Sequence, residues 1–137
     1  MIKKLTMTIL LAPITKKNSQ RIIQRHMPSK GKTVPMIIPS AKYVSYAEAA
    51  GHFIKGKGMK INYPVNVKAL YYMPTRRRVD LTNLHESLHD ILVKYEVVED
   101  DNSDIIATTD GSKVIKGCKD NPRTEVTITV IEDEEPV

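Results

Sequence analysis

The chain has 137 residues, enough for one domain with a modest core, and we expect a single domain over residues 1–137. With 41% hydrophobic residues, 27% charged residues and a net charge of +5, the composition excludes a disordered chain and is typical of a globular protein. No apolar run approaches the roughly 20 residues that cross a bilayer, so we expect no membrane partner, and the single Cys118 excludes an internal disulfide and favours the cytoplasm.

The first part of the chain predicts strands and a basic loop. Within residues 2–12, two lysines precede an apolar stretch that is interrupted by Thr6 and Thr8, a pattern that favours a strand over a signal peptide. The turn-like stretch PITKKNS follows, and QRIIQ at 20–24 predicts a second short strand. Residues 27–40 combine Pro and Gly with lysines, which predicts a mobile basic loop or hairpin with a short strand near 36–38.

The rest of the chain alternates helices with strands. Ser40 predicts the N-cap of a helix that continues to about Ile54, and period-2 alternation predicts a strand within 62–74. Apolar residues at helical spacing predict a second helix over about 81–95. Two further strands are expected at 105–114, with a turn at Asp110–Gly111, and at 124–132, and the acidic tail 132–137 is expected to fray. This order predicts an α+β fold, a small mixed sheet with two helices packed on it.

Charge is segregated along the sequence. Residues 1–78 contain 16 Lys and Arg against one acid, a charge of +15, whereas residues 79–137 contain five basic residues against 15 acids, a charge of −10. In one compact domain this segregation implies a strongly positive surface beside an acidic cluster. A dense basic surface most often serves a polyanion such as DNA, although lysines also serve solubility alone.

The two kinds of charge meet in the stretch RRRVDLTNLHESLHD at 76–90. Three arginines precede a helix that carries Asp80, Glu86 and Asp90, and a second acidic group, EDDNSD, follows at 99–104. Mg²⁺ binds one or two carboxylates together with waters and phosphate oxygens, so these groups suit a metal that acts on a polyanion. Two alternatives stay open: Asp80 as a helix N-cap that accepts from a first-turn amide, and Asp90 as a polar residue on the helix flank.

The segment HESLH at 85–89 matches the H-E-x-x-H zinc pattern in its letters. His85 and His89 would share one helix face, and Glu86 would act as the general base of a zinc peptidase. No histidine follows His89 to supply a third ligand, and the basic first half of the chain has no role in that mechanism. A zinc peptidase is therefore the less favoured alternative, from another class of enzyme.

Several of these segments together resemble the RusA family of Holliday junction resolvases, especially its phage-borne branch. The resemblance rests on PITKKNSQ near the start, IIPSAKY before the first helix, and MPTRRRVDLTNLHESLHDIL followed by VVEDDNSDI, in that order. It covers most of residues 8–130. It implies a homodimeric, Mg²⁺-dependent endonuclease of mixed α/β fold in the cytoplasm of a bacterial or phage-infected cell, with Mn²⁺ as a substitute metal and no small-molecule cofactor.

The resemblance also implies roles for individual carboxylates. It places Asp80 and Asp101 at the positions of metal-binding catalytic aspartates, with Asp100 beside Asp101. The chain departs from the family pattern at Thr82, where a second aspartate is usual, and at Glu86, where a lysine is usual. Because these two residues share a helix face and helical side chains lean towards the N-terminus, we expect Glu86 to take the place of the missing carboxylate.

The expected activity is the resolution of Holliday junctions and related branched DNA by paired phosphodiester hydrolysis. The residues that we expect to bind DNA phosphates are Arg76, Arg77, Arg78, Lys16, Lys17, Lys30 and Lys32. A two-fold dimer suits a four-way junction, which presents two equivalent strands to two active sites. The alternative within the same fold is a branched-DNA-binding protein whose catalysis is impaired by the changes at Thr82 and Glu86.

Overall fold

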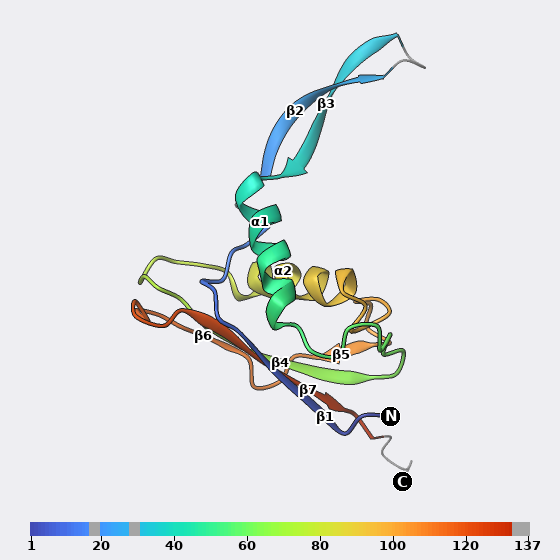
Figure 1. Cartoon of the computed structure of the whole chain (residues 1–137), viewed down its shortest axis with the longest axis vertical. Coiled ribbons are helices and arrows are strands. Elements are labelled where there is room, and N and C mark those ends of the chain that lie inside the picture. Colours follow the sequence, from blue (N-terminus) through green and yellow to red (C-terminus); the bar gives the residue numbers. More distant parts are fainter. Residues whose placement is uncertain (17–19, 28–30, 133–137) are drawn as a thin grey trace.

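The computed structural model describes residues 1–16, 20–27 and 31–132. Its strands are β1 (Lys4–Ile9), β2 (Gln20–Met27), β3 (Lys32–Pro39), β4 (Val65–Tyr72), β5 (Ile106–Thr108), β6 (Lys113–Ile115) and β7 (Arg123–Val130). Its helices are α1 (Ala41–Ala50), the 3₁₀ turn η3 (Gly51–Phe53) and α2 (Leu81–Lys94). The predicted α+β class is confirmed, because α1 and α2 lie on one face of a mixed sheet (Figure 1).

β4 is an interior strand of the main sheet, whose order is β1-β7-β4-β5, with β6 also paired to β4. β7 runs antiparallel to both β1 and β4. β5 and β6 instead run parallel to β4, beside its first and its last residues respectively. Because parallel neighbours need a crossover connection, α2 carries the chain from the end of β4 back to the start of β5. The end of β4 therefore leads directly into the segment with the three arginines.

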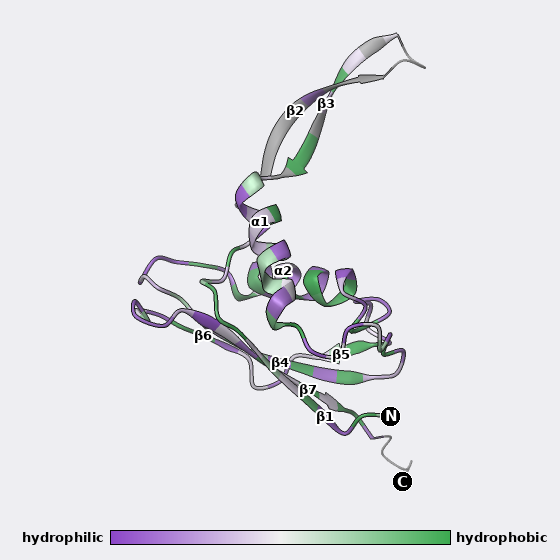
Figure 2. Ribbon diagram, in the orientation of Figure 1, coloured by the Kyte–Doolittle hydropathy of each residue, from purple (hydrophilic) through white to green (hydrophobic). Residues whose placement is uncertain are grey.

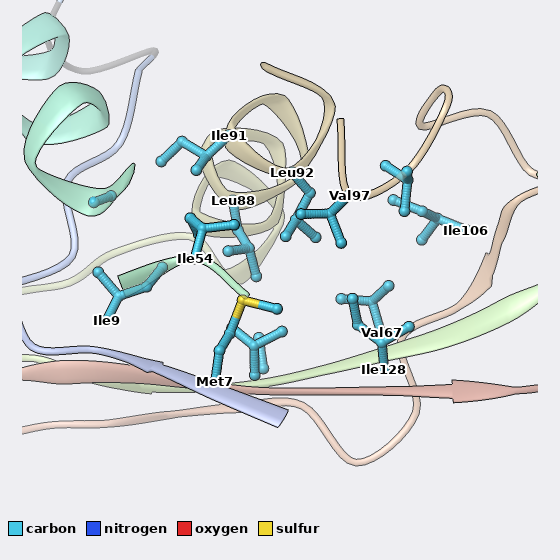
Figure 3. Packing of buried hydrophobic residues seen from close by; sticks show 14 of the residues in the cluster. Met7, Ile9, Ile54, Val67, Leu88, Ile91, Leu92, Val97, Ile106 and Ile128 are labelled. Atoms are coloured by element: carbon cyan, nitrogen blue, oxygen red, sulfur yellow. The ribbon is translucent and has the colours of Figure 1, made fainter. Parts of the chain in front are cut away.

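The core lies between the helices and the inner face of this sheet (Figure 3). In β4 every second residue is buried, as expected of a strand with one face against the core. In α2 the buried residues recur three or four positions apart, as expected of an amphipathic helix. Each large apolar side chain buried here contributes roughly 1.5–3 kcal/mol. The side chains that meet between these elements include Met7, Val67, Leu88, Leu92 and Ile128.

The predicted helices are confirmed, with small differences at their ends. Ser40 begins α1 as expected, because its Oγ accepts a hydrogen bond of 3.2 Å from the amide of Tyr43. α1 ends at Ala50, and the chain continues as the 3₁₀ turn η3 rather than as regular helix to Ile54. The strand expected at 105–114 is two short strands, β5 and β6, on either side of the predicted turn.

β2 and β3 form an antiparallel hairpin that shares no strand with the main sheet. The hairpin projects away from the sheet beyond the start of α1 (Figure 1). Both strands are longer than predicted, since β2 extends to Met27 and β3 spans Lys32–Pro39 rather than 36–38. Pro35 in β3 lacks an amide hydrogen, which a two-stranded ribbon tolerates because each strand has an unpaired edge.

Parts of two predicted segments lie outside the described residues. These are residues 28–30 of the basic hairpin and residues 133–137 of the acidic tail. In the part of the chain that the structure describes, neither helix has the length and apolar character needed to cross a membrane.

Candidate functional site

α2 separates two polar regions of the molecule. The helix follows the arginine segment at one end and precedes the acidic loop at 99–104 at the other. An α-helix rises 1.5 Å per residue, so the 14 residues of α2 span about 21 Å. The region at the start of α2 is basic, and the region near its end is acidic.

Asp80 stands at the N-cap position of α2, with φ −83° and ψ 126°. The alternative that its carboxylate caps the helix is wrong, because that side chain accepts no hydrogen bond from a first-turn amide. Its Oδ2 instead accepts from Nδ2 of the buried Asn83, at 3.4 Å. Asp80 is exposed, and its carboxylate is therefore open to a ligand from outside.

Arg77 and Arg78 line a pocket of about 290 Å³ together with Lys42 of α1. The other lining residues are Pro13, Ile14, Thr15, Met73, Thr75 and Val79, so three cations and no carboxylate face this space. We call it the cation pocket. Guanidinium groups donate paired hydrogen bonds to phosphate oxygens, which makes the pocket suited to a phosphodiester.

A second pocket, of about 460 Å³, lies between the C-terminal half of α2, α1 and the acidic loop. Its carboxylates are Asp90, Asp100 and Asp101, and we call it the carboxylate pocket. Lys16 and Lys94 are its basic residues. The remaining lining residues are Tyr43, Val44, Ala47, Ile91 and Val93. The acidic loop and Asp90, which are separate in the sequence, thus meet at one place.

Lys16 is paired with Asp90 in this pocket. Its Nζ donates a hydrogen bond of 3.1 Å to Oδ2 of Asp90, and each side chain is 33% exposed. This hydrogen bond is the main reason that the pKa of Lys16 is raised. A pair exposed to this extent contributes at most about 1 kcal/mol to stability. The partner of Lys16 in the structure is thus a carboxylate, and its expected contact with DNA phosphate stays a prediction.

The two aspartates of the acidic loop have opposite electrostatic environments. Asp101 is exposed, but partial desolvation of its carboxyl group raises its pKa, and the neighbouring Asp100 and Asp90 raise it further. The pKa of Asp100 is lowered, chiefly because its Oδ1 accepts a hydrogen bond of 2.8 Å from the amide of Asp101, and also because Asn102 donates to its Oδ2. A divalent cation would relieve the repulsion among these carboxylates. Carboxylate oxygens are also the ligands that Mg²⁺ prefers, so the residues present fit this metal.

One protomer does not bring Asp80 and Asp101 together. Asp101 lines the same pocket as Asp90, and Asp90 is about 15 Å from Asp80 along the helix axis. Within residues 1–16, 20–27 and 31–132, no three His, Cys, Asp or Glu side chains form a group that could hold a metal ion. Mg²⁺ needs only one or two carboxylates, because water and phosphate supply its other ligands.

Glu86 lies on the Asp90 side of α2. It is exposed, and it precedes Asp90 by four residues, which places the two on one helix face. The pKa of Tyr43 is raised mainly by burial, and the nearby charges of Asp90 and Glu86 add to this rise. Thr82 is exposed at the start of the helix. The expectation that Glu86 replaces a carboxylate at position 82 stays a prediction.

His85 and His89 form a stacked pair, with ring centroids 5.4 Å apart and planes at 6°. Burial lowers the pKa of both, to about 4 for His89, where the charge of His85 adds to the effect. Their Nε2 atoms are buried and have no hydrogen-bond partner among the described residues, while Nδ1 of His85 lies 2.7 Å from the hydroxyl of Tyr71. A catalytic zinc needs three protein ligands and an open position for substrate. Among the described residues no third ligand joins this partly buried pair, so the pair does not support the peptidase alternative.

Three charged residues that line these pockets, Lys42, Asp90 and Lys94, were not among the predicted site residues. Lys42 joins the arginines only because α1 packs beside their segment. Asp90 was predicted as a possible flank residue, although its four-residue spacing from Glu86 was a signal for a shared face. Of the predicted DNA-binding residues, Lys17 and Lys30 lie outside the described residues, and Lys32 is the first residue of β3.

The model of the family described as Endodeoxyribonuclease RusA matches residues 13–129 of the 137-residue chain. The matched region includes every residue that lines the two pockets. No individual curated protein gives a significant match.

Proposed function

Because this chain belongs to the RusA endodeoxyribonuclease family, it is a nuclease that acts on junction DNA, and we propose that it resolves Holliday junctions by Mg²⁺-dependent hydrolysis of paired strands. The observation that carries the proposal is a pair of complementary pockets, one beside the segment that precedes α2 and one beside the C-terminal half of α2. The cation pocket suits a phosphodiester, and the carboxylate pocket suits a divalent cation.

The metal ligands in this proposal are Asp80, Asp101, Asp100 and Glu86, and we add Asp90 because it shares a pocket with Asp101. When bound, a divalent ion polarises the scissile phosphate and lowers the pKa of a bound water. The carboxylates contribute negative charge that holds the ion beside a substrate that is itself an anion.

The basic residues position the DNA in this proposal. Arg77, Arg78 and Lys42 hold backbone phosphates at the start of α2, close to Asp80 in the chain. Such contacts fix the register of the DNA without reading its bases. Because the arginines adjoin Asp80 in the sequence, a phosphate group that they bind would lie near this carboxylate.

A homodimer is part of the proposal because one protomer keeps Asp80 and Asp101 apart. In a two-fold dimer the start of α2 in one protomer can lie beside the end of α2 in the other. Asp80 would then share a metal with Asp101 of the partner subunit. The two sites of such a dimer would face the two equivalent strands of a four-way junction.

The test is cleavage of a labelled synthetic four-way junction beside a linear duplex of the same sequence. We expect symmetric paired nicks in the junction alone, in Mg²⁺ or Mn²⁺ but not in EDTA, and we expect Asp101→Asn to abolish them. Binding without cleavage by the unmodified protein would instead indicate a junction-binding protein with impaired catalysis. Absence of both binding and cleavage would contradict the proposal.

Glu86→Gln tests the departure from the family pattern. We expect this variant to lose metal-dependent cleavage and to keep its affinity for the junction, because the charge removed lies away from the cation pocket. Glu48→Gln is the matched control, since Glu48 is an exposed acid on α1 that lines neither pocket. Full cleavage by Glu86→Gln would exclude Glu86 as a metal ligand.

A further inference from the structure

The connection between β6 and β7 is fixed to the segment that follows β4. The amide of Gly117 donates to the carbonyl of Thr75 at 3.2 Å, and the amide of Cys118 donates to the carbonyl of Met73 at 2.8 Å. The two loops therefore lie side by side at one end of the sheet (Figure 1), and both are hydrophilic (Figure 2). They form a single surface although about 40 residues separate them in the sequence.

Arg76 belongs to this surface and not to the cation pocket. Gly117 has φ +74°, a conformation that glycine adopts without strain, and a side-chain carbon there would lie 3.4 Å from the guanidinium of Arg76. Arg77 and Arg78 line the cation pocket, whereas Arg76 does not. The three consecutive arginines are thus divided between two places.

The surface formed by these two loops is positively charged, and its cationic side chains are exposed to solvent. Arg76, Lys116 and Lys119 are exposed, and none forms an ion pair with a carboxylate in the part of the chain that the structure describes. We call these three residues the loop surface. Asp120 is the one acid within 116–122. The nearby Arg123 is already engaged, since it pairs with Glu125 at 2.9 Å and lies over the ring of Tyr72 at 3.6 Å.

We propose that the loop surface binds a second stretch of DNA backbone, distinct from the one held in the cation pocket. This inference rests on the proposed function and deepens it by adding Lys116 and Lys119 to the DNA contacts. Exposed, unpaired cations on a surface fixed by backbone hydrogen bonds are suited to phosphate oxygens. Because the loop that carries these lysines is hydrogen-bonded to Met73 and Thr75, which also line the cation pocket, the two places together would extend the contact with the DNA backbone beyond one phosphate.

The first test is the salt dependence of junction binding, measured in EDTA so that no strand is cut. We expect Lys116→Gln/Lys119→Gln to weaken binding and to reduce the slope of log Kd against log salt by about 1.8, because each phosphate contact contributes about 0.9. Lys55→Gln/Lys57→Gln is the matched control. It removes the same charge from two exposed lysines in the connection that leads into the start of β4. The loop surface lies beyond the other end of β4.

A second test uses Cys118, which is the only cysteine and lies between the two lysines. We expect saturating junction to slow its alkylation several-fold in the unmodified protein, and this protection to be lost in the double variant. If the unmodified protein binds the junction but the double variant keeps its affinity, salt slope and protection, the inference is wrong and the proposed function stands. If the unmodified protein does not bind junctions at all, both are wrong.

Discussion

Nζ of Lys16 lies 3.1 Å from Oδ2 of Asp90, so one carboxylate of the carboxylate pocket already has a cation of the protein as its partner. Lys16 precedes the hairpin, and Asp90 lies on α2, so the contact joins two distant parts of the chain. A metal ion that uses Asp90 must compete with this ammonium group. In the proposed function, the strength of metal binding would therefore depend on Lys16, a residue that is not itself a ligand.

The variant Lys16→Gln should raise the metal affinity of the free protein. An exposed pair of this kind contributes up to about 1 kcal/mol, so we expect Mn²⁺, followed by electron paramagnetic resonance, to bind up to about fivefold more tightly. Lys94→Gln is the control, because Lys94 lines the same pocket but forms no ion pair with a described carboxylate. Equal affinity in Lys16→Gln and the unmodified protein would show that the metal does not use Asp90.

Metal affinity should also depend on pH through Asp101. Its pKa is raised by partial desolvation, and by Asp100 and Asp90, and only its ionised form binds a cation. As pH falls, we expect affinity to decline at a higher pH than an ordinary aspartate would produce. Titrations of Mn²⁺ binding at a series of pH values measure this decline. In Asp101→Asn, the decline in Mn²⁺ affinity that protonation of Asp101 causes should be absent. If the decline persisted, the group that takes up the proton would be another residue.

The half-buried His89 predicts a loss of stability in acid. The pKa of His89 is lowered from 6.5 to about 4, mainly by burial, so the unfolded chain binds a proton more readily than the folded one. The stability linked to His89 is complete above pH 6.5 and is lost as pH falls towards 4, by about 1.4 kcal/mol per unit of pKa, or on the order of 3 kcal/mol.

Urea denaturation at pH 7 and at pH 4.5 measures this loss. We expect His89→Leu to reduce the difference between the two conditions. His52→Gln is the control, because His52 is exposed and replacing it should leave the difference unchanged. If His89→Leu had the same pH dependence as the unmodified protein, acid destabilisation would arise elsewhere.

Removal of the Tyr71 hydroxyl should destabilise the fold. Tyr71 is 2% exposed, and its hydroxyl lies 2.7 Å from Nδ1 of His85. Tyr71→Phe leaves that nitrogen without its partner in an apolar setting, which costs about 1–3 kcal/mol. Tyr72→Phe is the matched control. The Tyr72 hydroxyl donates to Glu125 where solvent can replace it, so we expect a loss of about 0.5 kcal/mol or less. Equal losses of unfolding free energy in urea would contradict this account.

The elements with strong periodicity were the ones that the sequence could predict. β4 has apolar residues at every second position and α2 has them at helical spacing, so local pattern and burial agree. β3 was only partly predicted, because Pro35 and Pro39 interrupt its apolar run and proline usually indicates the end of a strand. The parallel pairing of both β5 and β6 with β4 was not predicted, since short strands do not specify their neighbours.

The candidate site was predictable in its residue types and less so in its geometry. The arginines, Asp80 and the acidic loop were named from the sequence, because their chemistry is visible without a fold. Lys42 and the Lys16–Asp90 pair depend on α1 and the N-terminal segment packing beside α2, which no local pattern encodes. The division of the three arginines between two places depends on a hydrogen-bonded loop about 40 residues away.

The separation of the hairpin from the main sheet has a consequence for hydrogen exchange. β2 and β3 pair only with each other, and a ribbon of two strands has little stability of its own. Its amides should therefore exchange through local opening of low free energy, while those of β4 and β7 exchange only when the core unfolds. We therefore expect this arm to open and close without loosening the helix and sheet that hold the two pockets.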